Sequence, residues 1–266
     1  MAKRCFDFAL MRIKAHNSEY VSTGVGLMRV IVFIGLCCFY ANAEEPQLQV
    51  VTEEWVPYNF TNNKGEIDGR ATKKVREILA DASISYDIQS YPWARSMKLA
   101  QTDPNTMIYS IYRTPEREKL FQWACPLLQP VKEYLFKLKT RKDINLTTLD
   151  DAKHYLVSVV RGSVSNEFLI KNGFENGTNI DITADPSSSP RKLLAGYTDL
   201  IMTTEYTAFE SLKALNVAFD KIEIALEVTN TNDNKACVAF SHTTDKALVD
   251  KVRAALKRHN LRHIGP

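Results

Sequence analysis

The sequence lacks the short motifs by which common enzyme classes are recognised. It contains no G-x-G-x-x-G, no P-loop, no G-x-S-x-G and no H-E-x-x-H. Its five histidines and five cysteines are scattered over 266 residues and form no cluster at zinc-ligand spacing. Adjacent acids such as Glu53-Glu54 and Asp150-Asp151 occur, but neighbouring acids mostly mark a solvated face. These patterns predict no enzyme, no cofactor and no metal site.

Outside its first 43 residues the chain also lacks net charge. The whole sequence carries a formal charge of +3, from 34 Lys and Arg and 31 Asp and Glu. Residues 1–43 hold five of the bases and two of the acids, so the remainder has twenty-nine of each. A neutral remainder gives no support to nucleic-acid binding.

Long hydrophobic runs are missing, with one short exception. Residues 30–39 form an apolar run of about ten, which suits the core of a signal peptide and is short for a membrane span. Ala41-Asn42-Ala43 follows, a small-x-small cleavage pattern. We expect residues 1–43 to be a leader, with Met28 as an alternative start, cleaved near Ala43 to leave an exported protein without a membrane span. The alternatives are an uncleaved anchor, a buried core helix, or a lipid anchor at Cys37 or Cys38.

Only Cys125 and Cys237 remain beyond this leader. Two cysteines in an exported protein can form a disulfide. Two separately buried thiols fit the sequence equally well.

Strand-like and helix-like patterns alternate along the rest of the chain. Apolar stripes predict helices over 73–82 and 245–258, and Ser189-Pro190 resembles an N-cap with proline in the first helical position, followed by 191–195. The alternation predicts an α/β architecture with a largely parallel sheet, in one large domain or two modest ones. The expected strands are 48–52, 86–89, 107–112, 134–139, 156–161, 180–183, 200–203, 222–226 and 236–240.

Two arginines follow the expected strand that ends at Tyr112. In open α/β sheets, ligands bind beyond the carboxyl ends of the strands. Arg113 and Arg117 lie there, and a guanidinium group offers a fork of donors that matches a carboxylate. The alternative for either arginine is a surface ion pair with Glu116 or Glu118, which contributes little energy.

Aromatic residues follow two other strands. Trp55 and Tyr58 come directly after the first strand, and Trp93 follows the second. They could form a platform for a flat or cationic ligand, or a plug over the core. Arg95 fits a surface residue as well as it fits a residue that contacts the ligand.

An ordered set of motifs resembles the bacterial extracellular solute-binding proteins of family 3, the periplasmic polar amino acid receptors of ABC transporters. The resemblance spans about residues 48–258. It implies a type II periplasmic binding protein fold, with two α/β lobes, a mostly parallel sheet flanked by helices in each, and two hinge crossovers. The motifs are W-V-P-Y (55–58), G-E-I-D-G (65–69), R-T-P-E-R-E-K-L-F-Q-W-A-C-P (113–126), V-V-R-G-S (159–163) and A-G-Y-T-D-L-I-M (195–202).

The resemblance also assigns ligand-binding roles. Arg117 ends the T-x-x-R signature whose arginine binds the α-carboxylate in that family. Ser110 and Tyr112 match strand-end contacts, and Trp55 and Trp93 would sandwich the ligand. The turn Gly162-Ser163 would complete the carboxylate cradle.

The sequence departs from the family where amino acid binders hold the α-ammonium. Thr204 stands at the position of their aspartate, with Glu205 beside it, and Thr52 replaces an acid near the first strand. Tyr112 replaces a small residue and would narrow the pocket. The sequence therefore supports recognition of a carboxylate more strongly than recognition of an amino acid.

The resemblance divides the chain into a leader (1–43), lobe one (44–126 plus 241–266) and lobe two (127–240). Cys125 and Cys237 then each fall at a crossover, which makes a disulfide as well supported as two free thiols. We expect a monomeric periplasmic protein that binds a small carboxylate-bearing solute for an ABC permease. The alternatives are a dehydratase-like enzyme with Glu205 as acid or base, and a sensory module without a transporter.

Overall fold

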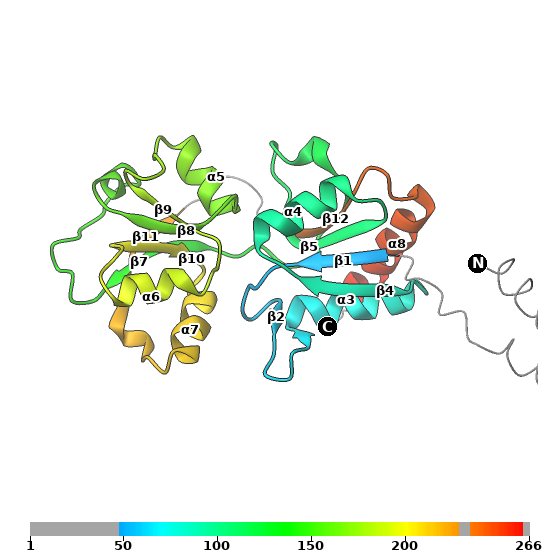
Figure 1. The fold of residues 1–266 in the computed structure, drawn as a ribbon, viewed down its shortest axis with the longest axis horizontal. Helices are drawn as coiled ribbons and strands as arrows, with labels where there is room; N and C mark the ends of the chain where they lie inside the picture. The colour runs from blue at the N-terminus through cyan, green and yellow to red at the C-terminus, as the bar shows by residue number, and fades with distance from the viewer. Residues whose placement is uncertain (1–47, 229–234, 263–266) are drawn as a thin grey trace, which may run out of the picture. The chain divides into compact units, whose positions relative to one another are not determined.

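The computed structural model describes residues 48–228 and 235–262 of the chain. The expected leader lies outside these residues. Two five-stranded sheets, each flanked by helices, make up the described chain (Figure 1). The prediction of two α/β lobes is confirmed.

Lobe one is the part built on the sheet with strand order β4-β1-β5-β12-β6. Strand β12 runs antiparallel to both of its neighbours, whereas the other four strands share one direction. Strands β2 and β3, which lie between β1 and α3 in the sequence, form a separate antiparallel two-stranded ribbon. The elements are β1 (Leu48–Thr52), β2 (Phe60–Thr61), β3 (Ile67–Asp68), α3 (Arg70–Asp81), β4 (Tyr86–Ser90), α4 (Trp93–Thr102), β5 (Thr106–Tyr112), η1 (Glu118–Leu120), β6 (Gln122–Ala124), β12 (Ala236–Phe240) and α8 (Lys246–Arg262).

Lobe two is the part built on the sheet with strand order β11-β7-β10-β8-β9. Here β7 is the reversed strand, antiparallel to β10 and β11. The elements are β7 (Glu133–Leu138), η2 (Asp150–His154), β8 (Val157–Val160), α5 (Val164–Lys171), β9 (Ile180–Thr183), α6 (Ser188–Leu194), β10 (Leu200–Thr203), α7 (Glu205–Ala214), η3 (Phe219–Lys221) and β11 (Ile222–Val228).

One lobe boundary needs correction. The sequence placed residues 127–240 in lobe two, but β12 pairs with β5 and β6 in the sheet of lobe one. All five residues of β12 are buried, because the strand has a neighbour on each side and helices over the sheet. The chain therefore returns to lobe one before residue 236.

A disulfide joins two neighbouring parts of lobe one. It links Cys125, just after β6, to Cys237 in β12, with 4.7 Å between their Cα atoms. The bond closes a loop that contains all of lobe two.

Helix α3 supports the loop that follows β1. Val75, Ile78 and Leu79 lie on its buried face, as the spacing predicted. The helix begins earlier than predicted, after Gly69, whose φ of 119° suits a residue without a side chain. A Cβ on Gly69 would lie 2.3 Å from the carbonyl oxygen of Tyr58, so only glycine lets this loop pack against the helix start.

Helix α6 differs from its predicted start. It begins at Ser188, so Ser189 is inside the helix rather than its N-cap, and Pro190 is the third helical residue. Proline is tolerated there because amides of the first turn have no partner within the helix.

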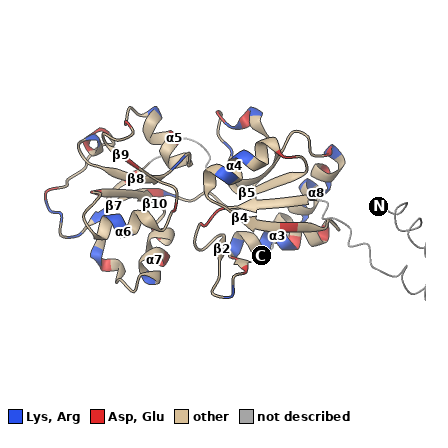
Figure 2. Ribbon diagram, viewed as in Figure 1, with Lys and Arg blue, Asp and Glu red and all other residues tan. Residues whose placement is uncertain are grey.

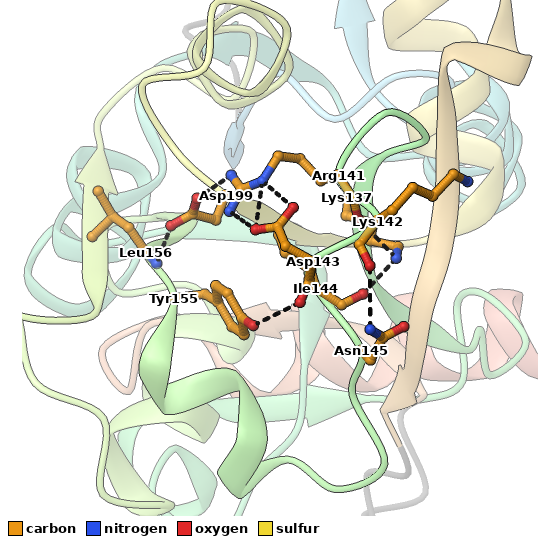
Figure 3. Close-up of polar contacts among 9 residues, drawn as sticks. All are labelled: Lys137, Arg141, Lys142, Asp143, Ile144, Asn145, Tyr155, Leu156 and Asp199. Carbon is orange, nitrogen blue, oxygen red and sulfur yellow. Dashed lines mark hydrogen bonds and ion pairs between the residues drawn. The ribbon is translucent and has the colours of Figure 1, made fainter.

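A polar network secures the long connection after β7. The Arg141 guanidinium pairs with Asp143 and with Asp199, and Asp199 also accepts a hydrogen bond from the amide of Leu156 (Figure 3). Since Asp199 precedes β10 and Leu156 precedes β8, the network ties this connection to two strands of lobe two.

Charges of both signs are interspersed on the two lobes (Figure 2). Over residues 48–228 and 235–262, no helix has the length and apolar character needed to cross a membrane.

Candidate functional site

A cavity of about 420 Å³ is lined by residues of both lobes. Its walls come from the segments after β1, β4 and β5 in lobe one, and from the start of β7 and the segments after β8, β9 and β10 in lobe two. Of the sequence-predicted ligand residues, the lining includes Trp55, Trp93, Ser110, Tyr112, Arg117, Ser163 and Thr204. These residues lie far apart in the sequence and meet because strand ends of both sheets face the same space.

Ser110 reaches the cavity through an irregularity in β5. The register with β12 shifts so that Cys237 pairs with Ile111 and Val238 with Tyr109, which leaves Ser110 without a partner residue. Its φ of 61° is unusual for a residue with a side chain. Such bulges and left-handed residues are often found at binding sites, where they re-aim a side chain. The Ser110 hydroxyl is buried and has no hydrogen-bond partner in the structure.

Arg117 is the most buried charged group of the site, with 2% of its surface exposed. Its Nη2 donates to the Gly162 carbonyl oxygen at 3.0 Å and to Glu167 Oε1 at 2.8 Å. Its Nε also donates to that same carboxylate oxygen at 3.2 Å. The guanidinium lies over the ring of Trp93, 5.1 Å from its centre. Arg117 of lobe one is thus joined to the turn before α5 and to the first turn of α5 in lobe two.

Arg113 has a different environment. It forms a two-bond ion pair with Glu118, both side chains being nearly half exposed, and it does not line the cavity. This is the surface pairing that the sequence analysis gave as its alternative.

Both tryptophans connect the lobes across the cavity. Trp93 Nε1 donates to the Gly162 carbonyl at 2.6 Å, and Trp55 Nε1 donates to the Thr207 hydroxyl at 3.1 Å. Trp55 also packs on Tyr112, with 5.9 Å between ring centres. The aromatic side chains therefore both wall the cavity and hold the lobes together.

Three sequence-predicted residues lie outside the lining. Tyr58 is buried and stacks behind Trp55, with ring centres 4.4 Å apart. Gly162 borders the site, and its carbonyl oxygen accepts hydrogen bonds from Trp93 Nε1 and Arg117 Nη2. Glu205 is exposed at the start of α7.

Thr204 has a structural role at the start of α7. Its hydroxyl accepts from the amide of Thr207, as an N-cap does, and donates to the Thr207 hydroxyl at 2.8 Å. An uncharged chain of hydrogen bonds, from Thr204 through Thr207 to Trp55, thus occupies the position at which the resemblance implies an aspartate in amino acid binders.

Four acids that the sequence did not predict as site residues line the cavity, namely Glu53, Glu54, Glu133 and Asp185. Glu53 follows β1 and Glu133 begins β7, and both line the cavity. Burial raises the pKa of Glu53 to about 8, although the nearby Arg117 lowers it. Burial also raises the pKa of Glu133 to about 7, against a hydrogen bond from Ser165.

Comparisons with known proteins agree with this architecture. A sequence profile of the bacterial extracellular solute-binding proteins, family 3, matches residues 48–261. No individual curated protein matches the sequence.

Solved structures show the same fold. A histidine kinase sensor domain with similarity to periplasmic binding proteins has a TM-score of 0.72 at 16% identity, covering 81% of this chain and 91% of that one. An ancestral arginine-binding protein bound to arginine has a TM-score of 0.70 at 19% identity, with 80% and 92% covered. A periplasmic His/Glu/Gln/Arg/opine family-binding protein from Silicibacter pomeroyi, in complex with lysine, has a TM-score of 0.67 at 15% identity, with 81% and 92% covered. At these identities the likeness establishes the fold.

Proposed function

Because the chain belongs to family 3 of the bacterial extracellular solute-binding proteins, we propose that it captures a small carboxylate-bearing solute in the cavity between its lobes. The solute would be an amino acid or a related compound. Arg117 carries this proposal, since its buried guanidinium lines the cavity and already holds a carboxylate oxygen, that of Glu167. A solute carboxylate in place of Glu167 would meet the same two N–H donors. Each such charge-assisted bond contributes roughly 1.5–3 kcal/mol.

The role that we propose is periplasmic capture for uptake through an ABC permease, by a monomer whose lobes close over the solute. The contacts of Trp55, Trp93 and Arg117 with lobe two support closure, because each joins a lobe-one side chain to lobe two at the cavity wall. A sensory module is the second candidate, because a histidine kinase sensor domain shares the fold. Uptake of labelled solute by cells with and without the gene separates the two roles.

An enzyme on this scaffold has less support. The expected acid or base, Glu205, is exposed and absent from the cavity lining. Recovery of intact solute after incubation with the protein is the expected result.

A thermal-shift screen of small carboxylates on the exported protein tests the carboxylate anchor. A solute that raises the melting temperature of the wild type should have no effect on Arg117→Ala. Arg113→Ala is the matched control, because Arg113 is an exposed arginine of the same segment outside the cavity. Equal stabilisation of the wild type and Arg117→Ala would contradict the assignment.

A further inference from the structure

We propose that the carboxylates of Glu53 and Glu133, which come from opposite lobes and line one cavity, form a subsite for the cationic end of the solute, an ammonium or guanidinium group. This inference deepens the proposed function and rests on it, since the same cavity would bind both ends of the solute.

Three buried polar atoms of the cavity lining have no hydrogen-bond partner among the described residues. Glu133 is 7% exposed, and its Oε1 accepts from the Ser165 hydroxyl at 3.0 Å, whereas its Oε2 has no partner. The buried hydroxyls of Ser110 and Tyr112, which line the same cavity, also have no partner. Buried polar atoms are rarely left unpaired in proteins, so these atoms indicate a ligand with hydrogen-bonding groups. The two hydroxyls can donate or accept, whereas an oxygen of ionised Glu133 can only accept and therefore requires a donor. A cationic N–H group is such a donor.

The charges of Glu53 and Glu133 both act on Tyr112, which lines the cavity. The pKa of the Tyr112 hydroxyl is raised well above its usual value, first by burial and then by the negative charges of Glu133, Tyr58 and Glu53. Tyr112 therefore lies within electrostatic reach of both carboxylates. Within residues 48–228 and 235–262 no hydrogen bond acts on the Glu53 carboxyl, whose pKa responds to burial and to the charges of Arg117 and Glu54.

Arg117 and Arg191 are the positively charged residues that line the cavity in the described part of the chain, and neither forms an ion pair with Glu53 or Glu133. The charge of Arg117 acts on Glu53 but is itself paired with Glu167, and Arg191 is exposed. Glu54, the other charge that acts on Glu53, has its own donors in Thr61 and Ser90. A cation between Glu53 and Glu133 would complete the charge balance and link the two lobes.

The surroundings favour an organic cation over a metal ion. Trp55 and Tyr112 provide aromatic walls, which attract ammonium and guanidinium groups. The described residues contain no group of three or more His, Cys, Asp or Glu side chains that could hold a metal ion. A cavity of about 420 Å³ also has room for a small organic molecule.

Three probes of matched length separate the two ends of the solute in calorimetric titrations at about pH 8, where Glu133 is mostly ionised and Glu53 is about half ionised. They are 4-guanidinobutyrate, with both charges, butylguanidinium, with only the cation, and pentanoate, with only the carboxylate. We expect both guanidinium probes to bind the exported wild-type protein. Glu133→Gln and Glu53→Gln should each weaken this binding on the order of ten-fold or more. Glu227→Gln, an exposed surface acid paired with Lys132, should leave it unchanged.

Proton release gives a second readout. A cation favours the ionised carboxylates, so binding near pH 7 should release protons, seen as a heat that depends on the buffer. Glu133→Gln should reduce this release, which a loss of packing alone would not do. Urea denaturation of each variant shows that it remains folded.

The outcomes separate the inference from the proposed function. Failure of both guanidinium probes to bind, or binding unchanged in both glutamine variants, overturns the cation subsite. If pentanoate then binds and Arg117→Ala abolishes that binding, the result supports Arg117 as the carboxylate anchor and rejects only the cation subsite. If no probe binds, the subsite is overturned and the carboxylate screen decides the proposed function.

Discussion

Raising the pH through neutrality should destabilise the ligand-free protein, because Glu133 must then ionise in a buried position. Glu133 has one hydrogen-bonded oxygen and one oxygen without a partner. Burial raises its pKa from 4.5 to about 7. The carboxylate form therefore costs more free energy in the folded protein than in the unfolded chain.

The sign and size of the effect follow from this shift. Below the unfolded value of 4.5 both states hold the proton, and the stability associated with the neutral acid is fully present. As the pH rises toward 7, the unfolded chain loses its proton first, so stability falls, and above the folded pKa it levels off. One pKa unit corresponds to about 1.4 kcal/mol, so the total loss from Glu133 is about 3 kcal/mol.

Urea denaturation of the oxidised protein at about pH 5 and about pH 8 measures this loss. The variant Glu133→Gln keeps the shape of the side chain and cannot ionise. Its stability should fall less than that of the wild type over this interval, by about 2.5 kcal/mol, because the unfolded chain is already largely ionised at about pH 5. The control Glu227→Gln should follow the wild type, because Glu227 is exposed and paired with Lys132. Parallel curves for the wild type and Glu133→Gln would refute the burial argument.

Two further predictions concern contacts between distant segments. Glu167→Gln should bind a carboxylate solute roughly ten-fold more tightly than the wild type in calorimetric titrations, because a neutral amide competes less well for Arg117 than a carboxylate. A variant that binds no more tightly would show that Glu167 remains on Arg117 in the complex. Replacement of Cys125 and Cys237 by serine should lower the free energy of unfolding by roughly 2–5 kcal/mol in urea denaturation, because the bond closes a loop around lobe two. Mass measurement after alkylation should show two more modified thiols when the protein is first reduced, and an unchanged count would contradict the pairing.

The strands could be predicted because the central ones are continuous apolar runs. All seven residues of β5 and all five of β12 are buried. Which sheet a strand joins is a different question, because pairing depends on partners far away in the sequence. For this reason β12 was assigned to the wrong lobe. The three-residue strand β6 was missed because it is too short to show a period.

Site residues could be predicted only where they lie at the carboxyl ends of strands, where ligands bind in open α/β sheets. Ser110, Tyr112 and Arg117 come after or at the end of β5, and the structure brings them to the cavity. Glu133 is instead the first residue of its strand, β7. Because β7 runs against β10, with Tyr134 opposite Thr203, the beginning of β7 lies at the edge where β10 ends. Only knowledge of this reversed strand would have placed Glu133 in the site.

The same geometry gives a reason why the proposed cation subsite would not need an acid at position 204. An aspartate there would place a charge on the hydroxyl chain from Thr204 through Thr207 to Trp55 Nε1, which now links α7 to lobe one. The acids lie instead at Glu53 and Glu133, near Tyr112. A solute with its carboxylate at Arg117 would then direct its cationic end toward β7 rather than α7.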